Sequence, residues 1–290
     1  MAGVALVLVL VSAVLHATWN FLVKRAGPAA SGVTFAWLFT SVSVVLFAPP
    51  ALWVLATREM GGGPVGIRFL AGSAVLHTAY FLILLRGYSV GDLSLVYPLA
   101  RGTGPVLASI GAFLLLGERV TVAAGAGVML VAAGVVVITG GHKLIRDTAS
   151  HAAVGYALLI GSFIGAYTVW DKHLVGTLAM PPLVLEWALS VAMSLLLAPV
   201  ALRRREELRA LWKSHRTTAV LGAVLGSGSY ILFLTALTMA PVSRAAPVRE
   251  ISIVVGAAMG SGLLAERDRS RRLLGALAIT LGVGVLAFGQ

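Results

Sequence analysis

Polar and ionisable side chains recur at helical spacing inside the long apolar runs of this chain. Side chains three or four positions apart lie on one face of a helix, so each such pair meets the same surroundings. In chain order the groups are His16 with Asn20, His77 with Tyr80, Tyr97 with Arg101, Tyr167 with Asp171, Tyr230, and Arg249 with Glu250. Polar groups at membrane depth are costly and usually face the bundle interior or a wet cavity. The set therefore predicts a central cavity that binds a polar solute.

Three of these residues are charged and lie about two turns inside their apolar runs: Arg101, Arg249 and Glu250. One interpretation is a structural ion pair between Glu250 and either arginine. One guanidinium is then left over, and an unpaired buried charge is expensive. An anionic group of a solute would neutralise it.

The other polar residues leave alternatives open. The two histidines either line the cavity or donate hydrogen bonds to a neighbouring helix. Tyr80 and Tyr230 are either lining residues or satisfied core tyrosines, and their matching places in two halves of the chain favour lining. Asp171 and Lys172 stand near the end of a run, so we interpret them as a pair that reaches the membrane interface.

About ten apolar runs are long enough to cross a bilayer, for which roughly 20 residues suffice. We expect all of them to be helices, because a helix satisfies its own backbone in lipid. The expected spans are 3–23, 32–56, 67–87, 93–116, 120–139, 152–172, 182–202, 217–239, 243–264 and 272–289. The fifth and tenth carry no such polar residues and are expected to be packing or dimerisation helices. The connection 203–216 is expected to be a short surface helix or a solvated loop.

The chain repeats itself after about 148 positions, which lays Trp19-Asn20 on Tyr167-Thr168 and Gly117-Glu118-Arg119 on Ala265-Glu266-Arg267. The fold class predicted is an all-α integral membrane protein with about ten transmembrane helices in two inverted five-helix repeats, residues 1–140 and 151–290. An odd number of spans per copy inverts the second copy, which is common in secondary transporters. Pro98 and Pro247 occupy equivalent places, and proline interrupts helix hydrogen bonding, so both are expected to be helix breaks.

Composition supports this reading. Hydrophobic residues make up 59% of the chain and charged residues 11%, with a mean hydropathy of +0.96. The absence of cysteine excludes disulfides and thiol catalysis. The net charge of +11 is scattered over short connections, so we expect no nucleic-acid partner. We expect no cofactor and no metal.

The chain resembles the EamA-like branch of the drug/metabolite transporter superfamily over essentially its full length. The segments that carry the resemblance are His16 to Asn20 followed by Lys24, Gly91 to Gly102, Leu116 to Arg119, Tyr167 with Asp171-Lys172, Ala240 to Ser243, and Arg249-Glu250 followed by Glu266-Arg267. The resemblance implies ten helices in two inverted repeats, a central cavity, alternating access, and transport of small metabolites such as amino acids. It also implies cytoplasmic termini.

The charge bias gives the opposite orientation. Fifteen basic residues lie near odd-numbered connections and five near even-numbered ones. Because basic residues near span ends stay in the cytoplasm, both termini are predicted to be extracytoplasmic. The expected location is the bacterial plasma membrane.

The function predicted is secondary transport of a small anionic or zwitterionic metabolite, as a monomer or homodimer, with protons as the candidate coupling ion. The alternative is a flippase for a lipid-linked or phosphorylated headgroup, which a lateral opening lined by Arg101 or Arg249 would favour. An intramembrane enzyme is disfavoured, because the sequence holds no His-Glu-x-x-His or Gly-x-Ser-x-Gly motif. A scaffold is disfavoured because it needs no charges at the membrane midplane.

Overall fold

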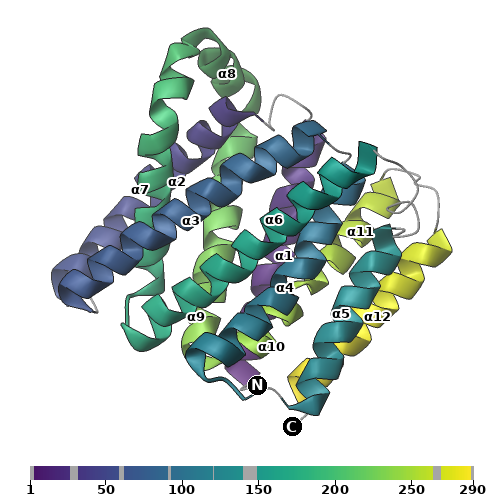
Figure 1. The fold of residues 1–290 in the computed structure, drawn as a ribbon. Coiled ribbons are helices and arrows are strands. Elements are labelled where there is room, and N and C mark those ends of the chain that lie inside the picture. Colours follow the sequence, from purple (N-terminus) through teal and green to yellow (C-terminus); the bar gives the residue numbers. More distant parts are fainter. Residues whose placement is uncertain are drawn as a thin grey trace.

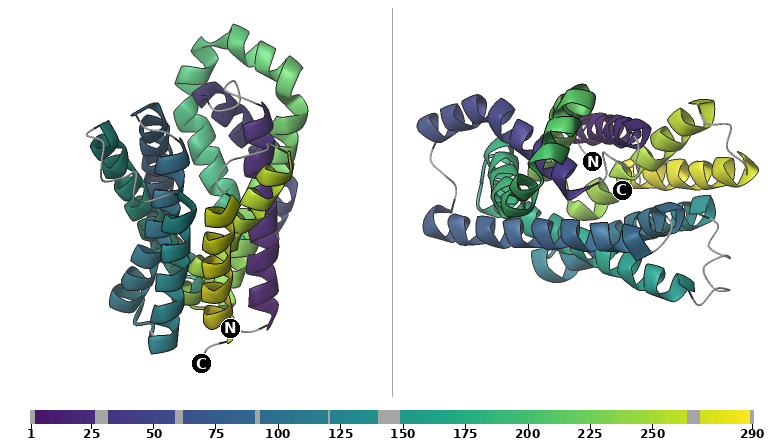
Figure 2. Two further views of the ribbon diagram at one scale, coloured as in Figure 1. Left: turned by 90° about the vertical axis from the view of Figure 1, so that its right-hand side faces the viewer. Right: turned by 90° about the horizontal axis from the view of Figure 1, so that it is seen from above.

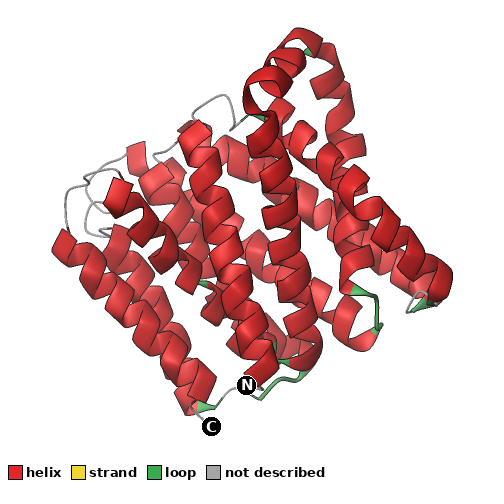
Figure 3. Ribbon diagram, turned by 180° about the vertical axis from the view of Figure 1, so that it is seen from behind, coloured by secondary structure: helices red, strands yellow, loops and turns green. Residues whose placement is uncertain are grey.

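A computed structural model describes residues 3–26, 32–58, 62–90, 93–119, 121–139, 149–263 and 269–288. These residues form helices joined by short loops, with no strand among them (Figure 3). The helices of the first half are α1 (Gly3–Ala26), α2 (Val33–Thr57), α3 (Gly63–Val90), α4 (Leu93–Leu116) and α5 (Val122–Thr139). Those of the second half are α6 (Ala149–Lys172), α7 (Pro182–Arg203), α8 (Arg205–Gly222), α9 (Gly228–Met239), α10 (Val242–Arg249), α11 (Ile251–Leu263) and α12 (Arg269–Phe288).

The described helices suit a bilayer by length and composition. Seven helical segments are long and apolar enough to cross it, and two shorter apolar helices lie at Val122–Val137 and Leu274–Leu286. Large apolar side chains cover the outside, among them Trp53 at 65% exposure and Leu115 at 77%. In water such a surface would be a liability, whereas hydrocarbon solvates it. The all-α membrane architecture is confirmed, and the number of ten crossings stays a prediction.

The connection 203–216 is helical, which decides between the two alternatives for it. Non-helical dihedral angles at His215 (φ −127°, ψ 18°) divide α8 into a surface segment and the start of a long crossing. Leu211 is buried against Phe35 and Leu38 of α2. The surface segment therefore packs on the bundle, at the end of the molecule opposite the start of α1 and the end of α12 (Figure 1).

The two prolines behave differently. The helix that carries Pro247 is interrupted at Glu250, which separates α10 from α11, as predicted. Around the break the amide of Glu250 bonds to the carbonyl of Pro247 at 3.0 Å, the shorter i−3 pattern. The expected break at Pro98 is wrong, because α4 runs without interruption from Leu93 to Leu116. Pro98 is near the start of its helix, where one missing amide leaves most of the ladder intact.

Helix α6 extends further than its apolar run suggested. A π-helical turn, His173–Thr177, follows it directly. The crossing therefore ends about one and a half turns beyond Asp171. This extension moves Asp171 away from the interface and into the packed bundle, where it is 0% exposed.

Close backbone contacts hold the bundle together. A Cβ on Gly161 of α6 would lie 3.0 Å from the carbonyl oxygen of Ala100 on α4. A Cβ on Gly134 of α5 would lie 2.7 Å from the carbonyl oxygen of Gly275 on α12. Helices α5 and α12 run side by side (Figures 1 and 2). The predicted packing role of the fifth and tenth spans is thus confirmed, and it joins the two halves of one chain.

Candidate functional site

Two clusters of buried and half-buried polar side chains lie between the helices. The arginine cluster consists of Arg101, Ser229, Arg249, Glu250 and Ser252. The aspartate cluster consists of Ser73, His77, Asp171 and Tyr230. Both clusters draw on helices from both halves of the chain.

Arg101 and Glu250 form an ion pair across the two halves. The Nε of Arg101 lies 3.0 Å from Oε2 of Glu250, and its Nη2 donates to the hydroxyl of Ser252 at 3.1 Å. Arg101 is 7% exposed and Glu250 2%. The break between α10 and α11 places Glu250 toward α4. Of the two partners predicted for Glu250, the structure selects Arg101.

Arg249 has different surroundings. Its guanidinium carbon lies 4.4 Å from the ring centroid of Phe233 and 5.5 Å from that of Tyr230, which is cation–π geometry. Its Nη2 approaches the hydroxyl of Ser229 at 3.4 Å, and its Nε has no hydrogen-bond partner among the described residues. The described part of the chain places no carboxylate within ion-pair distance of Arg249. This is the leftover guanidinium that the sequence predicted.

Ser229 is held in turn by α1. The hydroxyl of Ser12 donates to the carbonyl of Ser229 at 2.7 Å, and the hydroxyl of Ser229 donates back to the carbonyl of Ser12 at 2.9 Å. The polar group nearest to Arg249 is therefore fixed in place.

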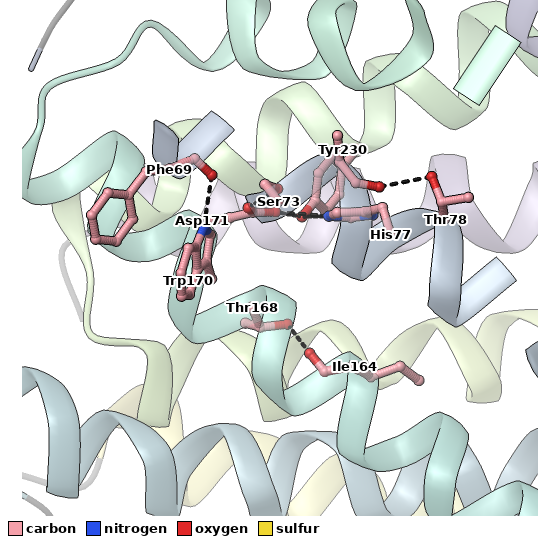
Figure 4. A network of polar contacts seen from close by, with 10 residues as sticks. Phe69, Ser73, His77, Thr78, Ile164, Thr168, Trp170, Asp171 and Tyr230 are labelled. Atoms are coloured by element: carbon pink, nitrogen blue, oxygen red, sulfur yellow. Dashed lines mark hydrogen bonds and ion pairs between the residues drawn. The ribbon is translucent and has the colours of Figure 1, made fainter. Parts of the chain in front are cut away.

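Asp171 is the centre of the aspartate cluster (Figure 4). Its Oδ2 accepts the phenolic hydroxyl of Tyr230 at 2.5 Å and lies 2.8 Å from Nε2 of His77. Its Oδ1 accepts the hydroxyl of Ser73. The interpretation of Asp171 as an interfacial residue is wrong, because the π-helical turn lengthens its crossing.

Aromatic rings connect the two clusters. Tyr167 stacks on His77 with the ring centroids 4.2 Å apart and meets Tyr80 edge-on at 5.4 Å. Tyr167 also lines a small cavity with Arg101, Arg249, Glu250, Phe233 and other residues. The space there suffices for about one water molecule.

The remaining predicted residues are less central. The imidazole of His16 is within electrostatic reach of Arg101 and Arg249. Asn20 donates its side-chain amide to the carbonyl of His16 at 2.7 Å, within its own helix. The side chains of Tyr97 and Pro98 lie outside the described residues. Both arginines are buried, so neither is exposed at a lateral opening of the kind a flippase would use.

A family model described as the EamA-like transporter family matches residues 3–140 and 151–288. The chain belongs to that family. The EamA-like family is part of the drug/metabolite transporter superfamily, and its members are transporters and not enzymes. The protein is accordingly a multi-pass membrane transporter built from two repeats.

A solved structure described only as "Crystal structure of protein" resembles this EamA-like transporter in fold. Its TM-score is 0.76 at 16% sequence identity, over 97% of this chain and 95% of that chain. At this identity the likeness concerns the fold alone. No curated protein matches the sequence.

Sequence reasoning about this transporter missed several polar residues in addition to Asp171. Ser73 and Ser229 carry no distinctive signal, because serine is common in apolar helices. Glu186 of α7 accepts a hydrogen bond from the hydroxyl of Ser190 at 3.4 Å and is half-buried. The position of Glu186 inside the span could have been inferred, because it lies within a long apolar run.

Glu118 and Lys172 hold helix ends at the side where α4, α6 and α9 end. Glu118 accepts the backbone amides of Val242 and Ser243 at 2.7 and 3.0 Å. Lys172 donates to the carbonyls of Leu237 and Ala240 at 2.5 and 3.0 Å. Both side chains line an open hollow of about 560 Å³. Within the described residues, no group of three or more acidic or histidine side chains could hold a metal ion.

Proposed function

We propose that this EamA-like transporter moves a small anionic or zwitterionic metabolite, such as an amino-acid-like compound, by alternating access, and that Arg249 binds its acid group. One observation carries the proposal. Arg249 is 7% exposed, lines a small cavity, and has no ion-pair partner among the described acids. A carboxylate or phosphate would supply the missing charge.

The chemistry of arginine suits this role. Its planar guanidinium binds carboxylates and phosphates through two parallel hydrogen bonds and stays charged at any working pH. Stacking on Phe233 holds the plane in one orientation before a solute arrives. Arg101 is a poorer choice, since Glu250 and Ser252 already hold its guanidinium.

The size of the cavity supports alternating access. The space beside Arg249 suffices for about one water molecule, so a metabolite needs the repeats, residues 1–140 and 151–290, to move apart. The open hollow beside Glu118 and Lys172 is our candidate for the route by which the solute enters. Each repeat contributes one arginine to the lining of that space.

The test compares Arg249→Gln with Arg101→Gln. A thermal-shift screen of the purified protein against carboxylates, amino acids, phosphate esters and amines first supplies a solute. We expect Arg249→Gln to retain its melting temperature and to bind that solute about 10- to 100-fold more weakly, the loss of a hydrogen-bonded charge. Uptake into proteoliposomes should fall in parallel.

Normal uptake by both variants would remove the anion hypothesis. So would a screen in which only cationic amines raise the melting temperature, because such solutes need an unpaired carboxylate. Arg101→Gln should instead lower the melting temperature, because it leaves Glu250 without its partner.

The orientation prediction is tested separately. We propose that the protein lies in a bacterial plasma membrane with the basic segment of α8 inside and both termini outside. The expected result is no signal from a C-terminal reporter that is active only in the cytoplasm, and a signal from the same reporter inserted after Arg205. Activity at the C-terminus would restore the orientation that the family resemblance implies.

A further inference from the structure

We propose that Asp171 is a proton-binding site of this carrier, and that the proton it takes loosens the hydrogen bonds by which α6 holds α3 and α9 and so couples proton movement to opening. The inference rests on the proposed transport function. It adds a second substrate, the proton, and the side chain that carries it. The starting observation is the aspartate cluster, which the solute site does not use.

The aspartate cluster supplies hydrogen-bonding partners for an ionised Asp171 carboxylate. Three groups converge on Asp171: the hydroxyls of Ser73 and of Tyr230, the latter at 2.5 Å, donate to it, and Nε2 of His77 lies 2.8 Å away and donates in the tautomer that carries its hydrogen there. An ionised carboxylate only accepts hydrogen bonds, so it can serve all three. A protonated carboxyl has a hydrogen to donate, so at least one of the three donors must turn away or lose its partner.

The hydrogen bonds at stake join the two halves of the chain. Ser73 and His77 are on α3 of the first repeat, whereas Asp171 and Tyr230 are on α6 and α9 of the second. Figure 4 shows these side chains meeting between their helices. Protonation therefore weakens a joint between the parts that have to separate in alternating access. Since Asp171 is 0% exposed, water does not replace the hydrogen bonds that are lost.

Besides His77, the titratable groups within electrostatic reach of Asp171 are Tyr230 of α9, Glu186 of α7 and Tyr167 of its own helix. Tyr167 is in turn within reach of Arg101, Arg249 and Glu250, so it connects Asp171 to the arginine cluster.

His77 provides a path by which a proton can reach Asp171, and Tyr230 connects Asp171 to the solute site. The side chain of His77 is 13% exposed and contacts Asp171, so its imidazole can pass a proton from water to the carboxylate. Tyr230 donates to Asp171, and its ring lies 5.5 Å from the guanidinium of Arg249. A shift of Tyr230 on protonation changes one wall of the solute site.

Infrared difference spectra of the purified transporter, taken between alkaline and acid buffers without solute, test the proton site. A protonated carboxyl gives its own C=O stretch. The chain holds eleven Asp and Glu residues, so we expect Asp171→Asn to remove one component of this band and Glu186→Gln, at the half-buried acid on α7, to keep that component. An unchanged band in Asp171→Asn overturns the proposal.

Tyr230→Phe keeps the test decisive if Asp171→Asn does not fold. The charged carboxylate then lacks one donor, so the band should appear at a higher pH, by at least about tenfold in proton affinity. A titration identical to that of the wild type also overturns the proposal.

Distance measurements test the coupling. The chain contains no cysteine, so Val75→Cys on α3 and Met239→Cys on α9 can carry spin labels at two exposed positions. The distance should lengthen in acid, and Asp171→Asn should abolish the dependence on pH. A distance that does not respond to pH while the band titrates refutes the coupling. Neither experiment uses a solute, so normal transport by both Arg249→Gln and Arg101→Gln would overturn the anion hypothesis and leave a titrating Asp171 unaffected.

Discussion

Glutamine in place of Glu250 should lower the stability of the folded transporter by about 3–5 kcal/mol, the cost of leaving one partner of a buried ion pair uncompensated. Glu250 is 2% exposed and lies 3.0 Å from Arg101, which is 7% exposed. Arg249 is close by, so removing the carboxylate leaves two buried cations without an acid beside them. The measurement is unfolding in detergent, followed by melting temperature.

The chain provides a matched control for this substitution. Arg204 and Glu207 form an ion pair at 3.7 Å on the surface of α8, with side chains 56% and 45% exposed. Surface pairs contribute about 0–1 kcal/mol, so Glu207→Gln should leave the melting temperature nearly unchanged. The variant with both Arg101→Gln and Glu250→Gln should lose less stability than the sum of the single variants. Equal losses in Glu207→Gln and Glu250→Gln would contradict a special role for the buried pair.

Most of the fold could be predicted from the sequence because lipid leaves few choices. An apolar run in a bilayer has to be a helix, so run length and position nearly determine the elements. The predicted ends of the spans were wrong where a helix is irregular. The π-helical turn His173–Thr177 consists of ordinary apolar and polar residues, and nothing in its sequence distinguishes it from a loop.

The prolines show a second limit of prediction. The repeat makes Pro98 and Pro247 equivalent, yet the chain breaks only near Pro247. Proline removes one amide donor in both helices, so the contacts of the neighbouring side chains decide whether the helix breaks. In α10 the next turn holds Arg249 and Glu250, whose bonds to Ser229 and Arg101 favour a break that points each toward its partner.

The charged part of the site was predictable because charges are rare in these spans. Arg101, Arg249 and Glu250 stand out from an apolar background, and the structure brings them together. Asp171 was recognised as polar and then assigned to the interface, because depth was counted from the end of the apolar run. The serines that complete both clusters could not be found, since a serine in a helix can satisfy itself on its own backbone.

Glu118 shows how the family motif serves the site. In the sequence, Gly117-Glu118-Arg119 recurs as Ala265-Glu266-Arg267, and the pattern alone indicates no role for Glu118. In the structure the carboxylate of Glu118 accepts the amides of Val242 and Ser243, the first residues of α10, and the hydroxyl of Ser243 at 2.8 Å. A helix begins with amides that have no partner, and a negative charge there also suits the helix dipole. The counterpart Glu266 lies outside the described residues.

Glu118→Ala should therefore destabilise the transporter by about 2–3 kcal/mol, because three donors lose their acceptor together. Glu206→Ala is the control: Glu206 also lies in the first turn of a helix, α8, where the dipole contributes about 0.3–1 kcal/mol at an exposed position. Because α10 carries Arg249 at its other end, Glu118→Ala should also weaken solute binding, although Glu118 is absent from the small cavity. Wild-type stability in Glu118→Ala would mean that water from the adjoining hollow replaces the carboxylate. Normal stability together with weakened binding would instead assign Glu118 to the solute's route.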